Sequence, residues 1–184
     1  MIWSKPYADR VAKLRVPCGF ALVLAFAWLS RPTPASLTWG VPVSVAGLVL
    51  RAWAAGHLEK NTRLTSSGPY AFVRNPLYLG TSLVAAGLVI ASRRWILAAV
   101  FAAVFLLVYL PVIELEEQHL RDLFPDFSAY SARVHQLVPS WPESAGEKPF
   151  RWSLYKRNRE YEAGLGYAAG IAFLIAKILF NRES

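Results

Sequence analysis

The sequence has 184 residues, of which 55% are hydrophobic, 14% aromatic and only 17% charged. This balance is too apolar for an ordinary soluble domain, and it favours an integral membrane protein. The formal net charge of +8 does not indicate nucleic acid binding, because the basic residues gather at the ends of apolar stretches, as at a membrane surface. A single cysteine, Cys18, excludes a disulfide framework and a cysteine metal site, and we predict no metal site.

A short amphipathic helix is predicted before the first apolar stretch. Tyr7, Val11 and Leu14 recur at helical spacing. Ser4 is a suitable N-cap, and Pro6 stands in the first turn. We expect this helix to lie on the membrane surface.

Five apolar stretches follow, at residues 16–30, 38–56, 76–92, 95–113 and 162–180. A bilayer core requires about 20 helical residues, so the second, fourth and fifth are long enough, and interfacial residues complete the other two. Only Arg93 and Arg94 separate the third from the fourth, which predicts an antiparallel hairpin. We therefore predict an all-α polytopic membrane protein with about five transmembrane helices and short interfacial helices.

Lys and Arg are unevenly distributed among the connections. They are frequent before the first stretch, between the second and third, and between the fourth and fifth. The positive-inside rule therefore predicts a cytosolic N-terminus, and it puts residues 57–75 and 114–161 on the cytosolic side of an inner or plasma membrane.

The second of these connections holds another predicted amphipathic helix. Phe127, Tyr130, Val134 and Leu137 form its apolar face, and Pro139 ends it. Residues 141–148 have the composition of a linker.

The last apolar stretch contains a pair of glycines, Gly166 and Gly170. This small-xxx-small spacing suits close helix packing. The packing partner can be another helix of the same chain or a second copy, so a homo-oligomer through the last helix is one of two alternatives.

Residues 68–80 hold the first candidate site. Gly68 and Pro69 predict a turn, while Asn75 and Pro76 predict the cap and the first position of the next helix. The N–H groups at that helix start, beside the Arg74 guanidinium, suit an anionic group such as a carboxylate.

A second candidate site lies where the fourth stretch ends. Glu116 and Glu117 flank an apolar helix stripe, and carboxylates that are directed inward near a membrane usually indicate function. A structural ion pair is the alternative, since Arg121 is the i+4 neighbour of Glu117.

The two candidate sites share the spacing of one family pattern. The matching positions are Gly68, Tyr70, residues 74–80, residues 116–120, Phe124, Tyr130, Val134 and Pro139. Residues 57–139 thus closely resemble the isoprenylcysteine carboxyl methyltransferases and their relatives, the phospholipid N-methyltransferases. Asn75 replaces a signature His, Pro125 a Gly and Phe127 a Tyr, and the last apolar stretch is an addition to the usual ending of the family.

The resemblance implies a methyltransferase that uses S-adenosylmethionine at the cytosolic membrane face. Its substrate would be lipophilic or a lipid, such as an isoprenylcysteine carboxylate or a phospholipid amine. The implied catalytic residues are Arg74 and Glu116. The implied cofactor-binding residues are His57, Gly68, Tyr70, Arg74, Asn75, Pro76, Tyr78, Gly80, Glu116 and Glu117.

The apolar stretches and the resemblance together predict an organisation for the chain. Residues 1–184 would form a single membrane-embedded domain, with a methyltransferase core at 57–139. Residues 1–56 would supply the N-terminal helices, and residues 150–184 an interfacial segment with the last transmembrane helix. The expected partners are the membrane and a hydrophobic small molecule.

Several alternatives are left open. A lipid amine must lose a proton to a base, for which His57, Glu114 and His119 are candidates, whereas a carboxylate needs only a cation such as Arg51. The other functional classes are an NADPH-dependent membrane reductase of related fold and a non-catalytic scaffold or small transporter.

Overall fold

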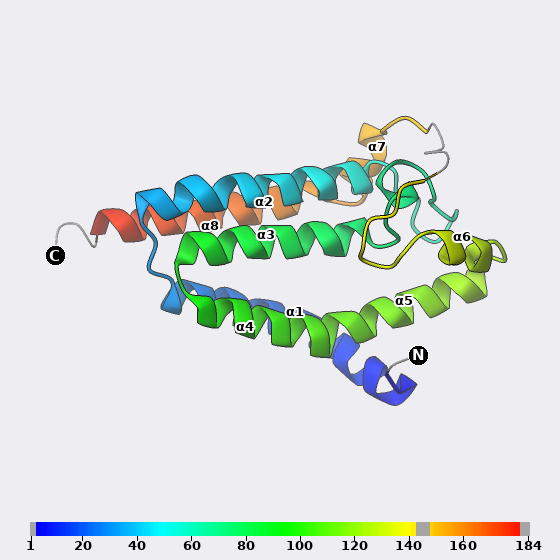
Figure 1. Ribbon diagram of the computed structural model, residues 1–184, viewed down its shortest axis with the longest axis horizontal. Helices are drawn as coiled ribbons and strands as arrows, with labels where there is room; N and C mark the ends of the chain where they lie inside the picture. Colours follow the sequence, from blue (N-terminus) through cyan, green and yellow to red (C-terminus); the bar gives the residue numbers. More distant parts are fainter. Residues whose placement is uncertain (1–2, 143–147, 181–184) are drawn as a thin grey trace. The chain divides into compact units, whose positions relative to one another are not determined.

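The computed structural model describes residues 3–142 and 148–180, and every regular element in these ranges is helical. Figure 1 labels the α-helices. In chain order the elements are α1 (Lys5–Leu29), α2 (Pro34–Ala55), the 3-10 turn η1 (Gly68–Ala71), α3 (Pro76–Ser92), α4 (Trp95–Val104), the π-helical turn η2 (Phe105–Tyr109), α5 (Leu110–Leu123), α6 (Phe127–Arg133), α7 (Trp152–Arg157) and α8 (Tyr161–Phe180). The all-α prediction is confirmed.

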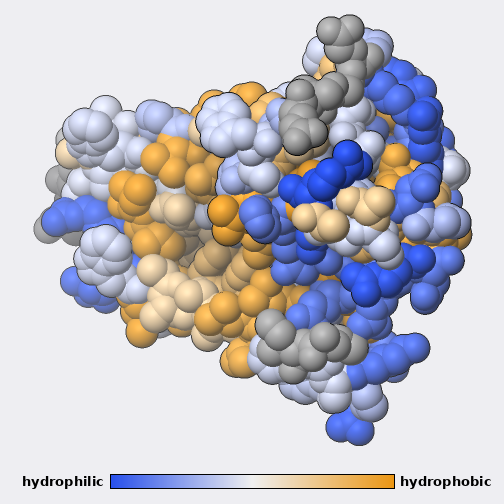
Figure 2. Space-filling view, turned by 45° about the vertical axis from the view of Figure 1, so that its right-hand side comes forward, coloured by the Kyte–Doolittle hydropathy of each residue, from blue (hydrophilic) through white to orange (hydrophobic). Residues whose placement is uncertain are grey.

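Among the described residues, four helices are long and apolar enough to cross a membrane. They are α1, α2, α8 and the continuous helix Trp95–Leu123 that α4, η2 and α5 form together. The predicted third span is α3, an apolar helix of 17 residues. Large hydrophobic side chains such as Phe20, Leu24 and Trp28 are exposed, and Figure 2 shows a broad hydrophobic surface. Such surfaces suit hydrocarbon rather than water, as in an integral membrane protein.

The N-terminal helix differs from its prediction. The expected surface helix and the expected first span are one helix, α1, so the division into two elements was wrong. Pro17 lies inside α1 and does not end it. A proline removes one main-chain hydrogen bond, but the preceding residues include good helix formers such as Ala, Lys and Leu, so the helix continues through it.

Residue contacts divide the chain into two compact units. The first unit comprises residues 1–42, 85–119 and 170–184, and within it α1 packs on α4 and η2. The Tyr7 hydroxyl donates a 2.8 Å hydrogen bond to the carbonyl of Leu107. Pro111, which follows four residues later, has no N–H to offer that carbonyl. Tyr7 thus satisfies a main-chain acceptor that an ordinary helix would satisfy internally.

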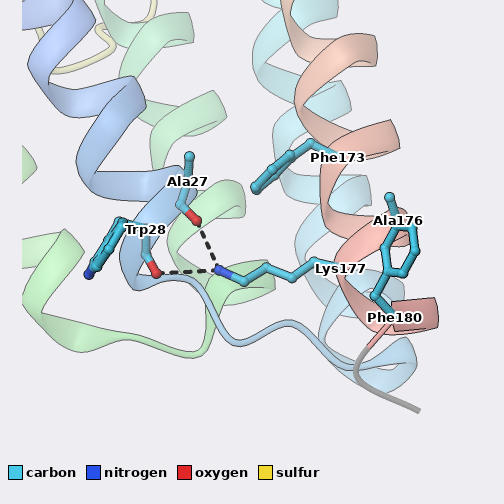
Figure 3. Close-up of a pocket in the computed structure, with 6 residues that line it drawn as sticks. All are labelled: Ala27, Trp28, Phe173, Ala176, Lys177 and Phe180. Atoms are coloured by element: carbon cyan, nitrogen blue, oxygen red, sulfur yellow. Dashed lines mark hydrogen bonds between the residues drawn. The ribbon is translucent and has the colours of Figure 1, made fainter. Parts of the chain in front are cut away.

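The end of α1 is held by a lysine within the same unit. The Lys177 ammonium donates to the carbonyls of Ala27 at 2.8 Å and Trp28 at 3.3 Å. It also lies 5.8 Å from the centre of the Phe173 ring. These residues line a groove with Ala176 and Phe180, shown in Figure 3. A cation at this place offsets the negative end of the helix dipole of α1.

The second unit comprises residues 43–84 and 120–169. Its buried core cluster is Phe127, Tyr130 and Val134, against which Leu64, Leu120 and Phe124 pack. The prediction that Pro139 ends this amphipathic helix was wrong, because α6 ends at Arg133 and Val134 is already extended. The early end frees the following residues to pair with the segment that carries the first candidate site.

Candidate functional site

The first candidate site begins where α3 starts. The main-chain carbonyl of Asn75 accepts a 3.1 Å hydrogen bond from the N–H of Leu79, and α3 begins at Pro76. The predicted first helical position is therefore confirmed, and Asn75 occupies the N-cap position. Pro76 is buried, and at this position its missing N–H costs no helical hydrogen bond.

The segment before α3 is held by main-chain hydrogen bonds to the residues after α6. Arg74 N–H donates to the carbonyl of His135 at 2.9 Å, and Asn75 N–H donates to that of Gln136 at 3.1 Å. Ser140 N–H donates to the carbonyl of Phe72 at 2.7 Å. This pairing fixes the backbone of residues 72–75, directly before the first residue of α3.

The Arg74 side chain also contacts the end of α6. Its Nη1 donates to the carbonyl of Val134 at 2.6 Å and to that of Ser131 at 3.0 Å. Carbonyls at a helix C-terminus lack intrahelical donors, and a cation there is favourable. Arg74 therefore has a structural contact, whereas its predicted contact with an anionic group stays a prediction.

Two tyrosines of residues 68–80 lie on successive elements. Tyr70 is buried in η1, and its carbonyl accepts a 2.7 Å hydrogen bond from the Tyr130 hydroxyl. Tyr78 is half-buried in the first turn of α3. Both were predicted to contribute to the cofactor site.

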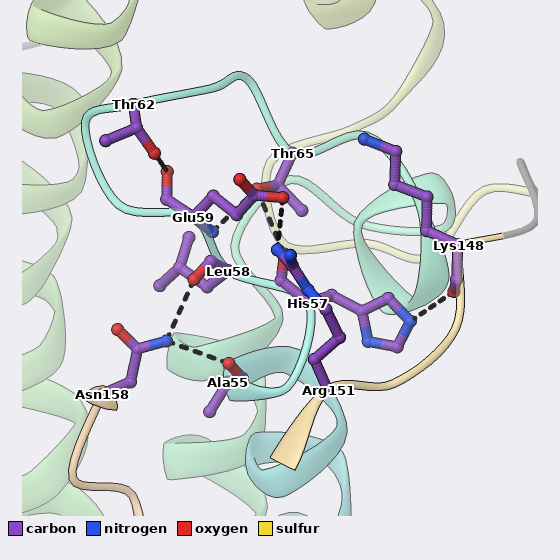
Figure 4. Close-up of polar contacts among 9 residues, drawn as sticks. All are labelled: Ala55, His57, Leu58, Glu59, Thr62, Thr65, Lys148, Arg151 and Asn158. Atoms are coloured by element: carbon purple, nitrogen blue, oxygen red, sulfur yellow. Dashed lines mark hydrogen bonds and ion pairs between the residues drawn. The ribbon is translucent and has the colours of Figure 1, made fainter. Parts of the chain in front are cut away.

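Gly68 and His57 are in direct contact. Gly68 has a φ of +59°, and a Cβ added to it would lie 2.6 Å from Cδ2 of His57. The His57 ring is buried, with Nδ1 2.9 Å from the carbonyl of Trp53 and Nε2 3.0 Å from that of Lys148. Figure 4 shows the second contact. Because both ring nitrogens contact carbonyls, a role for His57 as a base requires one contact to break.

The residues after position 148 are anchored to the end of α2, as Figure 4 shows. The Asn158 side-chain amide donates to the carbonyls of Ala55 at 2.9 Å and Leu58 at 3.0 Å. Arg151 forms an ion pair with Glu59. The sequence predicted a polar connection at this place, and the structure adds that it caps a helix.

Arg51 of α2 has a carboxylate partner that sequence reasoning missed. Its Nε lies 2.6 Å from Oε1 of Glu160, and its Nη2 lies 3.1 Å from Oε2. Its Nη1 donates to the carbonyl of Leu77 at 3.3 Å and to the hydroxyl of Thr81. The only sequence signal is an acidic residue next to the last apolar stretch. Arg51, predicted as a candidate cation for a carboxylate substrate, already binds a carboxylate of the protein.

Glu162, the next acidic residue after Glu160 in the sequence, has different surroundings. Glu162 is exposed and forms an ion pair with Arg159, which lies three residues earlier in the turn before α8. A hydrogen bond with Tyr161 and the charge of Glu162 raise the pKa of the Arg159 guanidinium. Glu162 therefore differs from Glu160 in exposure and in ion-pair partner. Substitution of Glu162 is consequently a suitable control for substitution of Glu160.

The second candidate site lies in the first unit. Glu116 is exposed and forms a 3.4 Å ion pair with Arg15, whereas Glu117 is half-buried. The Glu114 carboxylate accepts a 3.4 Å hydrogen bond from Trp3 N–H. Exposed ion pairs contribute about 0–1 kcal/mol to stability, so the Arg15 contact alone gives little reason for a glutamate at position 116. Within the described ranges, no three His, Cys, Asp or Glu side chains gather as metal ligands would.

Comparison with known proteins identifies the family. Residues 35–126, half of the chain, match the family model described as phospholipid methyltransferase. The chain belongs to the phospholipid methyltransferase family. The matched region includes residues 68–80 and the carboxylates Glu116 and Glu117, which confirms the resemblance inferred from these motifs. Members of this family use S-adenosylmethionine.

Two curated relatives are bacterial proteins named for metal resistance. The chain is 33% identical over 130 residues to the cobalt-zinc-cadmium resistance protein CzcN of Cupriavidus metallidurans, covering 70% of this chain and 58% of the relative. It is 34% identical over 114 residues to the nickel-cobalt-cadmium resistance protein NccN of Alcaligenes xylosoxydans xylosoxydans, covering 61% of this chain and 52% of the relative. The chain thus spans little more than half the length of these relatives. No solved structure gives a significant match.

Proposed function

We propose that this protein is an S-adenosylmethionine-dependent methyltransferase that acts on a lipophilic or lipid substrate at the cytosolic membrane face. The observation that carries the proposal is the position of residues 68–80. They fall inside the family match. Along the chain they comprise the turn η1, then Arg74, then the N-terminus of α3. Four helices suited to a bilayer support a hydrophobic substrate.

The chemistry of S-adenosylmethionine fits the groups at this site. The cofactor carries a carboxylate, an ammonium, a ribose diol and an aromatic base, and it supplies a methyl group on a sulfonium. The chain offers the Arg74 guanidinium, the first-turn amides of α3 and the Tyr70 and Tyr78 rings. First-turn amides have no acceptor inside their own helix and attract anions.

We assign roles to these groups accordingly. Arg74 and the start of α3 bind the anionic or polar groups of the cofactor, and Tyr70 and Tyr78 contact its adenine and methionine parts. Alignment of donor and acceptor in a dry site then supplies most of the rate enhancement. The resemblance assigns the cofactor ammonium or ribose to Glu116 or Glu117, and this assignment is a separate prediction.

Calorimetric titration of the purified chain tests the proposal. We expect S-adenosylmethionine and its demethylated product to bind, and NADPH not to bind. Absence of binding to the first two ligands overturns the methyltransferase proposal, and binding of NADPH alone favours a reductase. Incubation of lipid extracts with the protein and radiolabelled cofactor then identifies the acceptor.

The names of the two relatives favour an additional proposal. We propose that the activity contributes to tolerance of divalent transition metals, because both relatives are named as cobalt and cadmium resistance proteins. Expression of the wild type should raise the cobalt and cadmium concentrations at which a sensitive bacterial host still grows. Arg74→Ala at the same protein level should give no protection, and equal protection by both proteins contradicts a link to methyl transfer.

A further inference from the structure

All three nitrogens of the Arg51 guanidinium contact groups of the protein. Two of its nitrogens contact the two carboxylate oxygens of Glu160, and the third donates to Leu77 and Thr81. The Glu160 side chain is only 9% exposed and that of Arg51 only 22%. A paired and hydrogen-bonded guanidinium is tolerated when it is withdrawn from water, whereas loss of its carboxylate leaves a charge without compensation. The position of Arg51 therefore depends on Glu160.

Arg51 in turn contacts the first turns of α3. The carbonyl of Leu77 and the hydroxyl of Thr81 both accept hydrogen bonds from Nη1. Thr81 also donates to the carbonyl of Leu77 at 2.9 Å. The Arg51 guanidinium is thus bonded to the helix that begins two residues after Arg74, at Pro76, and that carries Tyr78.

Glycines let α2 and α3 approach closely beside this contact. A Cβ added to Gly80 would lie 2.6 Å from Cγ of Arg51, and one added to Gly47 would lie 2.6 Å from the carbonyl of Gly80. The Arg51 stem therefore crosses the α3 backbone where no side chain intervenes. Gly80 was predicted to bind cofactor, and its contact in the structure is with Arg51.

Glu160 lies between α7 and α8, and its main chain is bonded to α7. Its N–H donates to the carbonyl of Tyr155 at 3.3 Å, and nearby Asn158 donates to the end of α2. Glu160 lies outside residues 35–126, the region that matches the family model. The Glu160 carboxylate, from outside the matched region, thus binds Arg51 of α2, which lies inside that region.

We propose that Glu160 is a positioning residue for the cofactor site: by fixing Arg51 it sets the first turn of α3, and with it residues 74–78. This inference rests on the proposed function, because residues 74–78 are the segment to which we assign S-adenosylmethionine. The segment that follows the family core is thereby part of the working site.

The test uses the full chain in detergent with two measurements, the dissociation constant for S-adenosylmethionine and amide hydrogen exchange in peptides that cover residues 76–84. Glu160→Gln keeps the size of the side chain and removes its charge. We expect it to weaken cofactor binding about tenfold and to speed exchange in the first turns of α3. Glu160→Asp, which keeps the carboxylate, should recover part of both. Glu162→Gln, the matched control, should leave both unchanged.

A double-mutant cycle separates positioning from general loosening of the chain. Thr81→Val removes the hydroxyl that accepts a hydrogen bond from Nη1 of Arg51, and it leaves Glu160 and the Leu77 carbonyl in place. If Glu160 acts through that contact, Glu160→Gln and Thr81→Val together weaken cofactor binding by less than the product of their separate effects. If the loss of affinity in the double variant equals the product of the two separate losses, the residues act independently and the proposal is overturned.

The remaining outcomes are also decisive. Faster exchange in Glu160→Gln with an unchanged dissociation constant shows that the contact is structural only, and it overturns the proposal. Unchanged amide exchange in Glu160→Gln shows that Glu160 does not hold α3, and this result also overturns the proposal. If the wild type binds no S-adenosylmethionine, the proposed function fails and this role fails with it, and exchange still reports whether the contact between Glu160 and α3 exists.

Discussion

The Tyr130 hydroxyl donates a 2.7 Å hydrogen bond to the main-chain carbonyl of Tyr70, and both residues are buried. Tyr130 belongs to the core cluster of the second unit, and Tyr70 belongs to the turn η1 that precedes the signature. The bond therefore connects the core of the unit to the backbone of the candidate site.

We expect Tyr130→Phe to destabilise the protein by about 1–3 kcal/mol, because a buried carbonyl loses its donor while the ring volume is kept. Thermal unfolding in detergent, followed by tryptophan fluorescence, measures the change. Ser128→Ala, on the exposed side of the same helix, is the control and should leave the transition in place. An unchanged transition in Tyr130→Phe contradicts a structural role for this bond.

Substitution of Arg74 should affect both the cofactor and α6. Arg74→Ala removes the donor to the carbonyls of Ser131 and Val134 and the cation proposed for the cofactor. We expect cofactor binding to weaken at least about tenfold, or 1.4 kcal/mol, with a lower unfolding temperature. Arg74→Lys should recover part of the affinity, because it keeps the charge but loses the planar fork.

The exposed Arg133 in the last turn of α6 provides the matched control for Arg74. Arg133→Ala removes one positive charge from the same helix end. It should leave calorimetric binding of S-adenosylmethionine unchanged. Normal binding by Arg74→Ala shows that the site is misplaced.

Local signals predicted the start of the candidate site well. Asn75 as a cap followed by Pro76 gave the N-terminus of α3, and the apolar stretch 76–92 coincides with its bounds. Such signals depend on neighbours within one helical turn, which a single sequence shows directly. The same signals were less reliable at α6, which ends at Arg133, before Pro139, while Val134 is extended and buried in the core.

Partners that are distant in the sequence were not predicted. Arg51 and Glu160 are 109 residues apart, and Arg74 and Val134 are 60 apart. No spacing rule connects such positions, since they meet only after the helices pack. Arg51 consequently resembled a cation available for substrate, whereas its charge serves the fold.

The role of Glu116 can be separated from its ion pair. Glu116→Gln and Arg15→Gln each break the exposed pair, so each should change stability by less than about 1 kcal/mol. If Glu116 binds the cofactor, only Glu116→Gln should weaken calorimetric binding of S-adenosylmethionine, by about tenfold. Equal affinities in the two variants contradict the predicted role of Glu116.

The proposed orientation is open to a labelling experiment. Ser66 is exposed in the polar connection between α2 and α3, so a Ser66→Cys variant in a Cys18→Ala background carries one accessible thiol. The positive-inside rule predicts that a membrane-impermeant maleimide labels it only after the cytosolic side is opened. The Cys18→Ala protein alone is the blank, and labelling from outside intact cells reverses the topology.

Two glycine substitutions should have opposite effects on stability. Gly68 has a φ of +59°, and the His57 ring occupies the space that a Cβ would need. Gly68→Ala should therefore destabilise the protein by about 2 kcal/mol or more, since it adds left-handed strain to a steric clash. Gly164 lies inside α8 with no described neighbour within 4 Å of such a Cβ. There alanine should stabilise the helix by about 0.5–1 kcal/mol. Unfolding temperatures of both variants in detergent measure the effects, and a Gly68→Ala protein as stable as the wild type contradicts the His57 contact.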